Sequence, residues 1–238
     1  MTYNVHACRG GDGRVSPARI ARVIGEFFPD VVALQELDVG RRRSAFSHQA
    51  REIAAELQYA FYFYPAIEGR EGHFGNAILS RLPLRLVKAG LLPRGLSAVP
   101  TEPRALLWVA VELPTHEVQV LNTHLSLLRQ ERLKQVEALL GPEWLGDPRC
   151  QESAVLCGDF NAGPGSPELG ALAGRLQDVQ DRLPEPARNT WFSSKPVRRL
   201  DYILVSSHFG VEAVHVPRTA LVQDASDHLP LVSDLTLL

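Results

Sequence analysis

The chain has few cysteines and no long apolar run, and both shortages exclude whole classes of protein. Its 238 residues include three cysteines, Cys8, Cys150 and Cys157, with no CxxC pair among them. An odd count without this pairing argues against a disulfide framework and against a structural zinc site. No apolar run approaches the roughly 20 residues that a helix needs to cross a bilayer. With no signal peptide before the first predicted strand, we expect a reduced, cytoplasmic protein.

An excess of positive charge is lacking as well. Lys and Arg total 25 against 27 Asp and Glu, a formal net charge of -2. Proteins that bind the DNA backbone tightly usually carry a basic surface, so a high-affinity DNA enzyme is disfavoured. The exception is the short run Arg41–Arg43, which comes just after Glu36. It is either a solvated loop or a loop that faces phosphate, and we keep Arg41 as a candidate substrate contact.

No internal repeat, low-complexity tract or Pro/Gly/Ser-rich linker divides the sequence. Hydrophobic residues make up 45% of it and charged residues 22%, which is typical of a soluble globular protein. We therefore predict a single domain over residues 1–238, acting as a monomer.

Hydrophobic periodicity predicts many strands with a few helices between them. Ile20, Val23, Ile24, Phe27 and Phe28 form one apolar helical face after the Ser16-Pro17 start signal, and two further helices cover 49–57 and 130–140. A last helix begins at Ser166-Pro167. Strands are expected over 2–6, 30–37, 59–64, 75–81, 105–113, 117–125, 154–160, 200–205 and 211–216, with one more from near Leu229. Because 105–113 and 117–125 form a hairpin, we predict a layered α/β fold with mixed sheets.

Polar side chains gather at the ends of these apolar strands, where functional sites form on a rigid scaffold. They are Asn4, Glu36, His124, Asp159, Asn161 and the pair Asp227-His228. Carboxylate and amide oxygens without cysteine suit Mg²⁺ or Mn²⁺ better than zinc. A hard cation together with histidine donors is what phosphate-ester hydrolysis requires, because negative charge builds on the oxygens as water attacks phosphorus.

Each of these residues also has an ordinary structural explanation. Glu36 alone would more often be a surface carboxylate, and Asp159 with Asn161 could form an Asx-turn. A lone His124 is usually a satisfied core histidine, and His228 could belong to a turn. Asp201 is more informative, because a carboxylate that opens a buried strand needs a partner.

The order of the motifs decides between these explanations. Asn4 in TYNVH, Glu36 in LQELD, His124 in NTHL, Asp159 and Asn161 in GDFNA, Asp201 in RLDYIL, and Asp227-His228 in SDHLP follow one another along nearly the whole chain. This series resembles that of the endonuclease/exonuclease/phosphatase superfamily, which includes DNase I-like nucleases. The resemblance implies a four-layer α/β/β/α sandwich, in which two mixed β-sheets pack face to face with helices outside. It places the active site at one edge of the sandwich.

The resemblance also implies roles for the individual residues. Glu36 would be the principal ligand of Mg²⁺ or Mn²⁺, with Asn4 and Asp227 beside it. Asp159 would orient or deprotonate the attacking water, and Asn161 would hold that water or a phosphate oxygen. The remaining assignments are His228 as the group that stabilises charge on phosphorus, Asp201 as its partner, His124 as a donor to a phosphate or leaving-group oxygen, and Asn76 as a substrate contact.

Three functions remain open from the sequence. The first is hydrolysis of a phosphodiester, in a nucleic acid or in a small or phospholipid-type molecule. The second is phosphomonoesterase activity of the inositol-phosphatase type, which would need a lysine-rich cluster that we do not see. The third is a non-catalytic binding member of the fold. In DNase I-like enzymes His124 would have an acidic partner, and Glu68 and Glu71 are the candidates by location.

Overall fold

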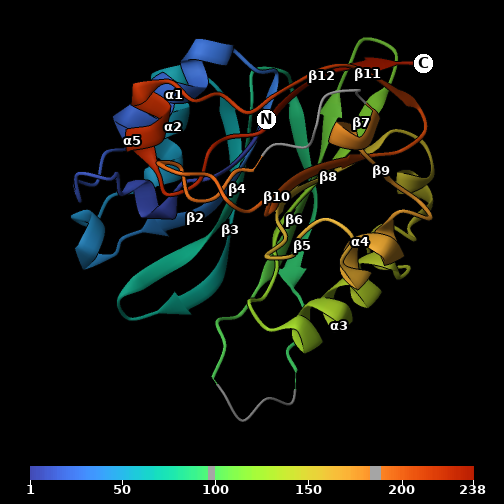
Figure 1. The fold of residues 1–238 in the computed structure, drawn as a ribbon, viewed down its shortest axis with the longest axis horizontal. Coiled ribbons are helices and arrows are strands. Elements are labelled where there is room, and N and C mark those ends of the chain that lie inside the picture. Colours follow the sequence, from blue (N-terminus) through green and yellow to red (C-terminus); the bar gives the residue numbers. More distant parts are fainter. Residues whose placement is uncertain (96–99, 183–188) are drawn as a thin grey trace.

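The computed structural model describes residues 1–95, 100–182 and 189–238 of the chain (Figure 1). Its helices are α1 (Pro17–Phe27), α2 (Gln49–Leu57), α3 (Arg129–Leu140), α4 (Pro167–Leu172) and α5 (Ala220–Ala225), with short 3₁₀ turns η1 (His6–Cys8), η2 (Arg42–Ser44), η3 (Pro148–Gln151) and η4 (Val179–Arg182). The strands are β1 (Thr2–Asn4), β2 (Val31–Val39), β3 (Ala60–Gly69), β4 (Gly72–Ser80), β5 (Leu84–Leu91), β6 (Ala105–Glu112), β7 (Glu117–His124), β8 (Ala154–Asp159), β9 (Gln177–Asp178), β10 (Asp201–Val205), β11 (Phe209–His215) and β12 (Val232–Leu237).

Two mixed sheets form the body of the molecule. The first has the order β1-β2-β4-β3, with β1 parallel to β2 and the other pairs antiparallel. The second has the order β5-β6-β7-β8-β10-β9, with β7 and β8 parallel. Figure 1 shows α1, α2 and α5 outside the first sheet, and α3 and α4 outside the second. The predicted four-layer α/β/β/α sandwich is therefore confirmed.

The helices begin where their capping residues predict. The Ser16 side chain accepts a hydrogen bond from the Arg19 backbone N–H, and Pro17 takes the first helical position of α1. Ser166 caps α4 in the same way. On the apolar face of α1, Ile20, Val23 and Ile24 are fully buried against the first sheet and Phe27 is partly buried. The prediction that Phe28 shares this face was wrong, because Phe28 is the left-handed C-cap of α1 and is 62% exposed. Local start signals and helical periodicity thus agree with the tertiary packing.

Three helices or strands have no counterpart among the predicted ones: β5, β9 and α5. β9 has only two residues. β5 is an edge strand that pairs only with β6, and its partly exposed sequence LRLVKAGL shows no clear alternation. α5 has six residues, less than two helical turns, which is too short for a repeating apolar face to show in the sequence, although Thr219 caps it. The final strand β12 begins at Val232 rather than near Leu229.

A buried polar bridge joins the two sheets close to the predicted site. Gln35 of β2 donates from Nε2 to Asn122 Oδ1 of β7 over 2.8 Å. Asn122 Nδ2 in turn donates to the backbone carbonyls of Leu34 and Ala77, each over 2.8 Å. Both side chains are fully buried. Since buried amides need these specific partners, the bridge sets the sheets in one register and so fixes Glu36 relative to His124.

Candidate active site

Strand register brings three of the predicted site residues side by side in the second sheet. β7 and β8 run parallel with His124 opposite Asp159, and β10 runs antiparallel with Asp201 opposite Asp159. Asp159 therefore lies between His124 and Asp201 in one row across three neighbouring strands. All three side chains are buried. Residues far apart in sequence thus meet at the shared edge of the sheet.

Gly158 permits this close approach. Its φ is +146°, and a Cβ added there would lie 1.9 Å from the Thr123 carbonyl oxygen. No other residue can occupy the position without moving β7 away from β8.

The first sheet contributes Asn4 and Glu36. β2 contains a bulge, because Leu34 pairs with Ala77 but Leu37 pairs with Gly75. Glu36 sits within the bulge in a left-handed conformation, with φ of +62°. Asn4 Nδ2 donates to Glu36 Oε1 over 2.9 Å and to Asp159 Oδ2 over 3.0 Å. Asn4 thus links the carboxylates of the two sheets.

The two oxygens of Asp159 have different surroundings. Oδ1 accepts the Asn161 backbone N–H over 2.9 Å, so the Asx-turn considered from sequence is present. Oδ2 accepts from Asn4 and lies 3.6 Å from both His124 Nε2 and His228 Nε2. Burial raises the pKa of Asp159 to about 7, against the lowering effect of His228. A carboxyl with a pKa near neutrality can exchange a proton under ordinary conditions.

His228 and Asp201 form a buried hydrogen-bonded pair. His228 Nδ1 lies 2.8 Å from Asp201 Oδ2, and both side chains are almost fully buried. Burial alone would lower the pKa of His228, but the carboxylates of Asp201 and Asp159 outweigh it and raise the pKa to about 10. The ring is therefore an imidazolium at neutral pH, with Nε2 as a donor toward Asp159.

His124 has other neighbours than the sequence predicted. Its Nδ1 lies 3.2 Å from Arg104 Nη1 and its Nε2 lies 2.9 Å from Asn161 Nδ2. The acidic candidates Glu68 and Glu71 are wrong: both are exposed at the β3–β4 hairpin. Burial, with Arg104 and His228, lowers the pKa of His124 well below its ordinary value, so this ring is neutral.

The other candidates lie around this centre. Asp227 Oδ1 is 3.5 Å from His6 Nδ1, at the more exposed rim. Asn76 is buried, and its Nδ2 donates to the Ala105 carbonyl over 3.2 Å. Arg41 Nη1 lies 3.9 Å from buried Asp38, and the Arg41 guanidinium covers the Phe74 ring. Its neighbour Arg43, rather than Arg41, lines a hollow of about 170 Å³ beside Glu36.

Sequence reasoning missed Arg104, which is 6% exposed and contacts the site directly. The structure pairs Glu112 with Glu117 and Leu106 with Thr123, which brings the segment before β6 next to His124. The predicted bounds 105–113 and 117–125 would instead pair residue 113 with 117, so the sequence did not set the register that brings Arg104 to His124.

The donor set fits a divalent cation. Glu36 and Asp159 present oxygens within reach of Asn4, and oxygen donors suit Mg²⁺ or Mn²⁺. Asp159, Asp201 and His228 also have candidate ligand atoms within 4.8 Å of one another. In this second group, however, the imidazole nitrogen and Asp201 already bond to each other. Glu36 with its neighbours is therefore the better cation site, because its carboxylate is partly open to solvent.

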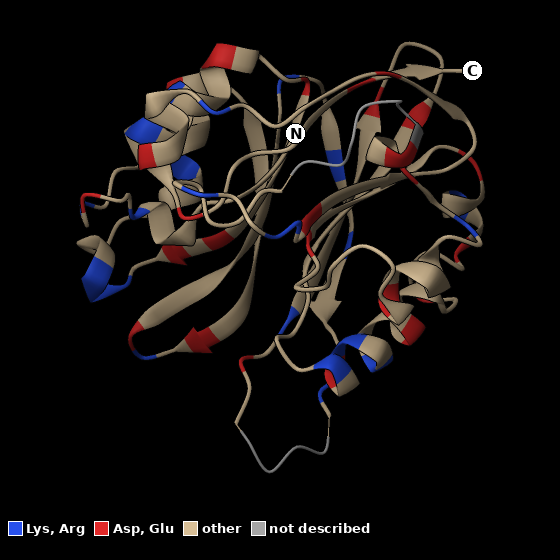
Figure 2. Cartoon of the chain, in the orientation of Figure 1, with Lys and Arg blue, Asp and Glu red and all other residues tan. Residues whose placement is uncertain are grey.

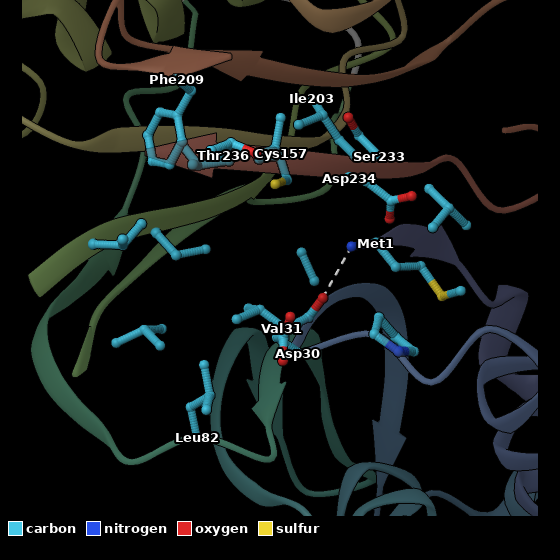
Figure 3. A pocket seen from close by; sticks show the side chains of 18 of the residues that line it. Met1, Asp30, Val31, Leu82, Cys157, Ile203, Phe209, Ser233, Asp234 and Thr236 are labelled. Carbon is cyan, nitrogen blue, oxygen red and sulfur yellow. Dashed lines mark hydrogen bonds between the residues drawn. The ribbon is translucent and has the colours of Figure 1, made fainter. Parts of the chain in front are cut away.

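A larger cavity, of about 560 Å³, lies at the opposite edge of the sandwich (Figure 3). Val31, Cys157, Ile203 and Phe209 line it, and the Met1 ammonium beside it donates to the Val31 carbonyl over 2.9 Å. This largely aliphatic lining contains none of the predicted site residues and lacks the convergent donors of the other edge.

Figure 2 shows basic and acidic residues interspersed over both helical layers. Among the described helices, none has the length and apolar character to cross a membrane.

Comparisons with known proteins identify the family of the chain. The model of the Endonuclease/Exonuclease/phosphatase family matches residues 1–228. The uncharacterized protein YbhP of Escherichia coli is 29% identical over 171 residues, which are 70% of this chain but only 64% of YbhP.

Two solved structures extend the likeness to the whole fold. An endonuclease/exonuclease/phosphatase from Beutenbergia cavernae is 25% identical with a TM-score of 0.78, over 99% of this chain and 70% of that one. The mannosyl-6-phosphatase Bt3783 of Bacteroides thetaiotaomicron is 21% identical with a TM-score of 0.78, over 99% and 98% of the two chains. The chain belongs to the endonuclease/exonuclease/phosphatase family, a superfamily of metal-dependent phosphoesterases.

Proposed function

We propose that this protein hydrolyses a phosphodiester with water, assisted by Mg²⁺ or Mn²⁺. One observation carries the proposal: Asp159 Oδ2 lies 3.0 Å from the Asn4 amide and 3.6 Å from two histidines, one of them cationic. The carboxylate of Asp159, the cationic His228 and, through Asn4, the carboxylate of Glu36 meet at one edge of the sandwich, and would serve as proton acceptor, charged donor and metal ligand. Water attack on phosphorus needs these three kinds of group together.

Glu36 would hold the cation, with Asn4 and Asp227 as further ligands. Bound there, the cation would polarise the phosphate and neutralise charge on its oxygens. Asn4 Nδ2 currently donates to Glu36 Oε1, whereas its Oδ1 accepts the His6 backbone N–H over 3.1 Å. Ligation by Asn4 would therefore require its amide to rotate, while Glu36 needs no such change.

Asp159 would take the proton from the attacking water. Each of its oxygens accepts one hydrogen bond, Oδ1 from the Asn161 backbone N–H and Oδ2 from Asn4. Oδ2 faces the two histidines and would be the oxygen that takes the proton. A pKa of about 7 for Asp159 suits a base that must accept a proton near neutral pH and release it afterwards. Asn161 would orient the water or a phosphate oxygen.

His228 would stabilise the charge that develops on phosphate. Its Nδ1 is engaged by Asp201, which leaves the Nε2–H free to donate to a non-bridging oxygen. The buried Asp201 keeps the ring protonated and in one orientation. His124 would be a second, neutral donor. Asn76 and Arg41 remain proposed substrate contacts at the periphery.

The test is hydrolysis of bis-p-nitrophenyl phosphate with Mn²⁺ or Mg²⁺, with and without EDTA. Asp159→Asn and His228→Ala should each lower kcat by roughly 10²–10⁴-fold while thermal unfolding stays cooperative. His116→Ala, in an exposed turn, is the matched control and should behave as wild type.

The alternatives give different results in the same assay. No metal-dependent release from wild type would favour a non-catalytic binding protein. Faster hydrolysis of p-nitrophenyl phosphate than of the diester would favour a phosphomonoesterase. Plasmid DNA, RNA and choline phospholipids then separate the classes of diester.

A further inference from the structure

Arg104 and Arg199 are the two buried arginines among the described residues. Arg199 pairs with Asp178, whose side chain is 10% exposed. The ion-pair partner that the described residues offer Arg104 is Glu102, at 3.5 Å, whose side chain is 58% exposed. The Arg104 side chain itself is 7% exposed, and its Nε, like that of Arg199, is buried without a hydrogen-bond partner in the described part of the chain. A buried cation with so weak a counter-charge is costly unless something else compensates it.

The surroundings of Arg104 contain too many donors. A guanidinium only donates, so the contact with His124 Nδ1 requires that nitrogen to accept. Asn161 Nδ2 donates one N–H to the Leu125 carbonyl over 3.0 Å, and its second N–H faces the other ring nitrogen. A neutral imidazole accepts at one nitrogen only, and a protonated ring at neither. At least one N–H therefore lacks an acceptor, and an anionic oxygen placed there would satisfy it.

The position of Arg104 next to His124 indicates which anion would bind there. His124 Nδ1 lies 3.9 Å from Glu36 Oε1, and His124 Nε2 lies 3.6 Å from Asp159 Oδ2. Arg104 thus borders the space between the proposed metal ligand and the proposed base, where the scissile phosphate would lie. Resting on the proposed function, we infer that Arg104 binds a non-bridging oxygen of the scissile phosphate together with His124. Glu102 partly neutralises the guanidinium until substrate arrives.

This assignment predicts opposite effects for two neighbouring variants. Arg104→Ala should raise the Kd for inorganic phosphate, measured by calorimetry with Mg²⁺, at least tenfold and lower kcat/KM for bis-p-nitrophenyl phosphate by roughly 10²–10³-fold. In both measurements Arg104→Lys should lie between wild type and Arg104→Ala, because it keeps the charge but loses the planar pair of donors. Glu102→Gln should tighten phosphate binding several-fold, since it removes the competing carboxylate. A merely structural arginine would not produce this opposite sign.

The control is Arg132→Lys on α3, whose side chain is 11% exposed and pairs with buried Glu168 of α4; it should leave both measurements unchanged. Bis-p-nitrophenyl phosphate has no flanking phosphate. If Arg104→Ala or Arg104→Lys harmed an oligonucleotide substrate but spared this compound, Arg104 would bind a flanking phosphate and the inference would be overturned. Unchanged phosphate affinity in Arg104→Lys and Glu102→Gln would overturn it too, even if Arg104→Ala failed to fold.

The proposed function fails separately. If wild type bound phosphate in an Arg104-dependent way but hydrolysed no ester, the anion site would stand and the hydrolytic proposal would fall. If wild type hydrolysed the diester and the Arg104 variants matched it, only the inference about Arg104 would fall.

Discussion

The pair Asp201–His228 gives the sharpest test of the proposed chemistry. We expect Asp201→Asn to leave the size of the side chain and one acceptor for His228 Nδ1 in place while removing the negative charge 2.8 Å away. Without that charge, burial still lowers the pKa of His228, and the remaining carboxylates still raise it. The pKa of His228 should then fall from about 10 toward its ordinary value of 6.5. A neutral ring bonded through Nδ1–H has no proton on Nε2 to donate to phosphate.

The size of the effect follows from the protonated fraction. At pH 8 this fraction would fall from about 99% to about 3%, which is a loss of roughly 30-fold in kcat. At pH 9 the loss grows to roughly 300-fold, and at pH 6 it is less than about twofold. A histidine whose pKa is raised in the folded protein keeps its proton until the pH passes that value. Wild type should therefore stay active to about pH 10, whereas the variant should decline above about 6.5.

The measurement is kcat for bis-p-nitrophenyl phosphate from pH 6 to 10, taken as a ratio of variant to wild type. Nitrogen-15 NMR of the metal-free protein reports the ring protonation of His228 directly. Asp178→Asn on β9, which removes the negative charge paired with Arg199 just before β10, is the control: it should lower stability without moving the pH profile. A ratio that does not change with pH, or a wild-type His228 that titrates below pH 7, would refute the reasoning.

Three further outcomes are expected. Glu36→Gln should weaken Mg²⁺ binding in calorimetry by at least tenfold with the fold intact, because the principal anionic ligand is lost; unchanged affinity would disprove the assignment. Burial raises the pKa of Asp159 from 3.8 to about 7 in the folded protein, so the folded state binds this proton more tightly than the unfolded state. In EDTA, wild type should therefore lose stability as the pH rises from 3.8 through 7. In thermal melts, Asp159→Asn should lose less stability than wild type over this pH range. An equal loss of stability in the variant and in wild type would contradict the prediction. Gly158→Ala should cost more than about 3 kcal/mol in urea unfolding, since its Cβ would meet Thr123 O at 1.9 Å; a loss below about 1 kcal/mol would contradict the close approach.

Much of this site could be predicted because its residues end apolar strands. Asn4, Glu36, His124, Asp159 and Asp201 all lie at strand ends, and the structure brings them into one cluster through the contacts of Asp159 and His228. Alternating or continuous apolar runs predict strands, and strand ends meet at sheet edges. Asp227 also lies near this edge, beside His6.

Side-chain choices within the site were less accessible. The sequence offered Glu68 and Glu71 as partners of His124, but the hairpin turns both toward solvent and Arg104 takes the position. Arg41 was singled out from its run, yet Arg43 is the member that lines the hollow beside Glu36. Which of two neighbouring side chains faces a site depends on the local turn, and composition does not encode that.

By itself the sequence determined most of the strands, the helix starts at Ser16 and Ser166 and the set of polar groups at the strand ends, because periodicity and capping act over a few neighbouring residues. It missed β5, β9 and α5, which are short or show no clear period. Only the tertiary structure decided which groups touch. The β2 bulge turns Glu36 toward the site, Gly158 lets β7 and β8 close up, and the bridge from Gln35 to Asn122 sets one sheet against the other. The proton states of Asp159 and His228 follow from that packing, since burial and charges within a few ångströms set a pKa.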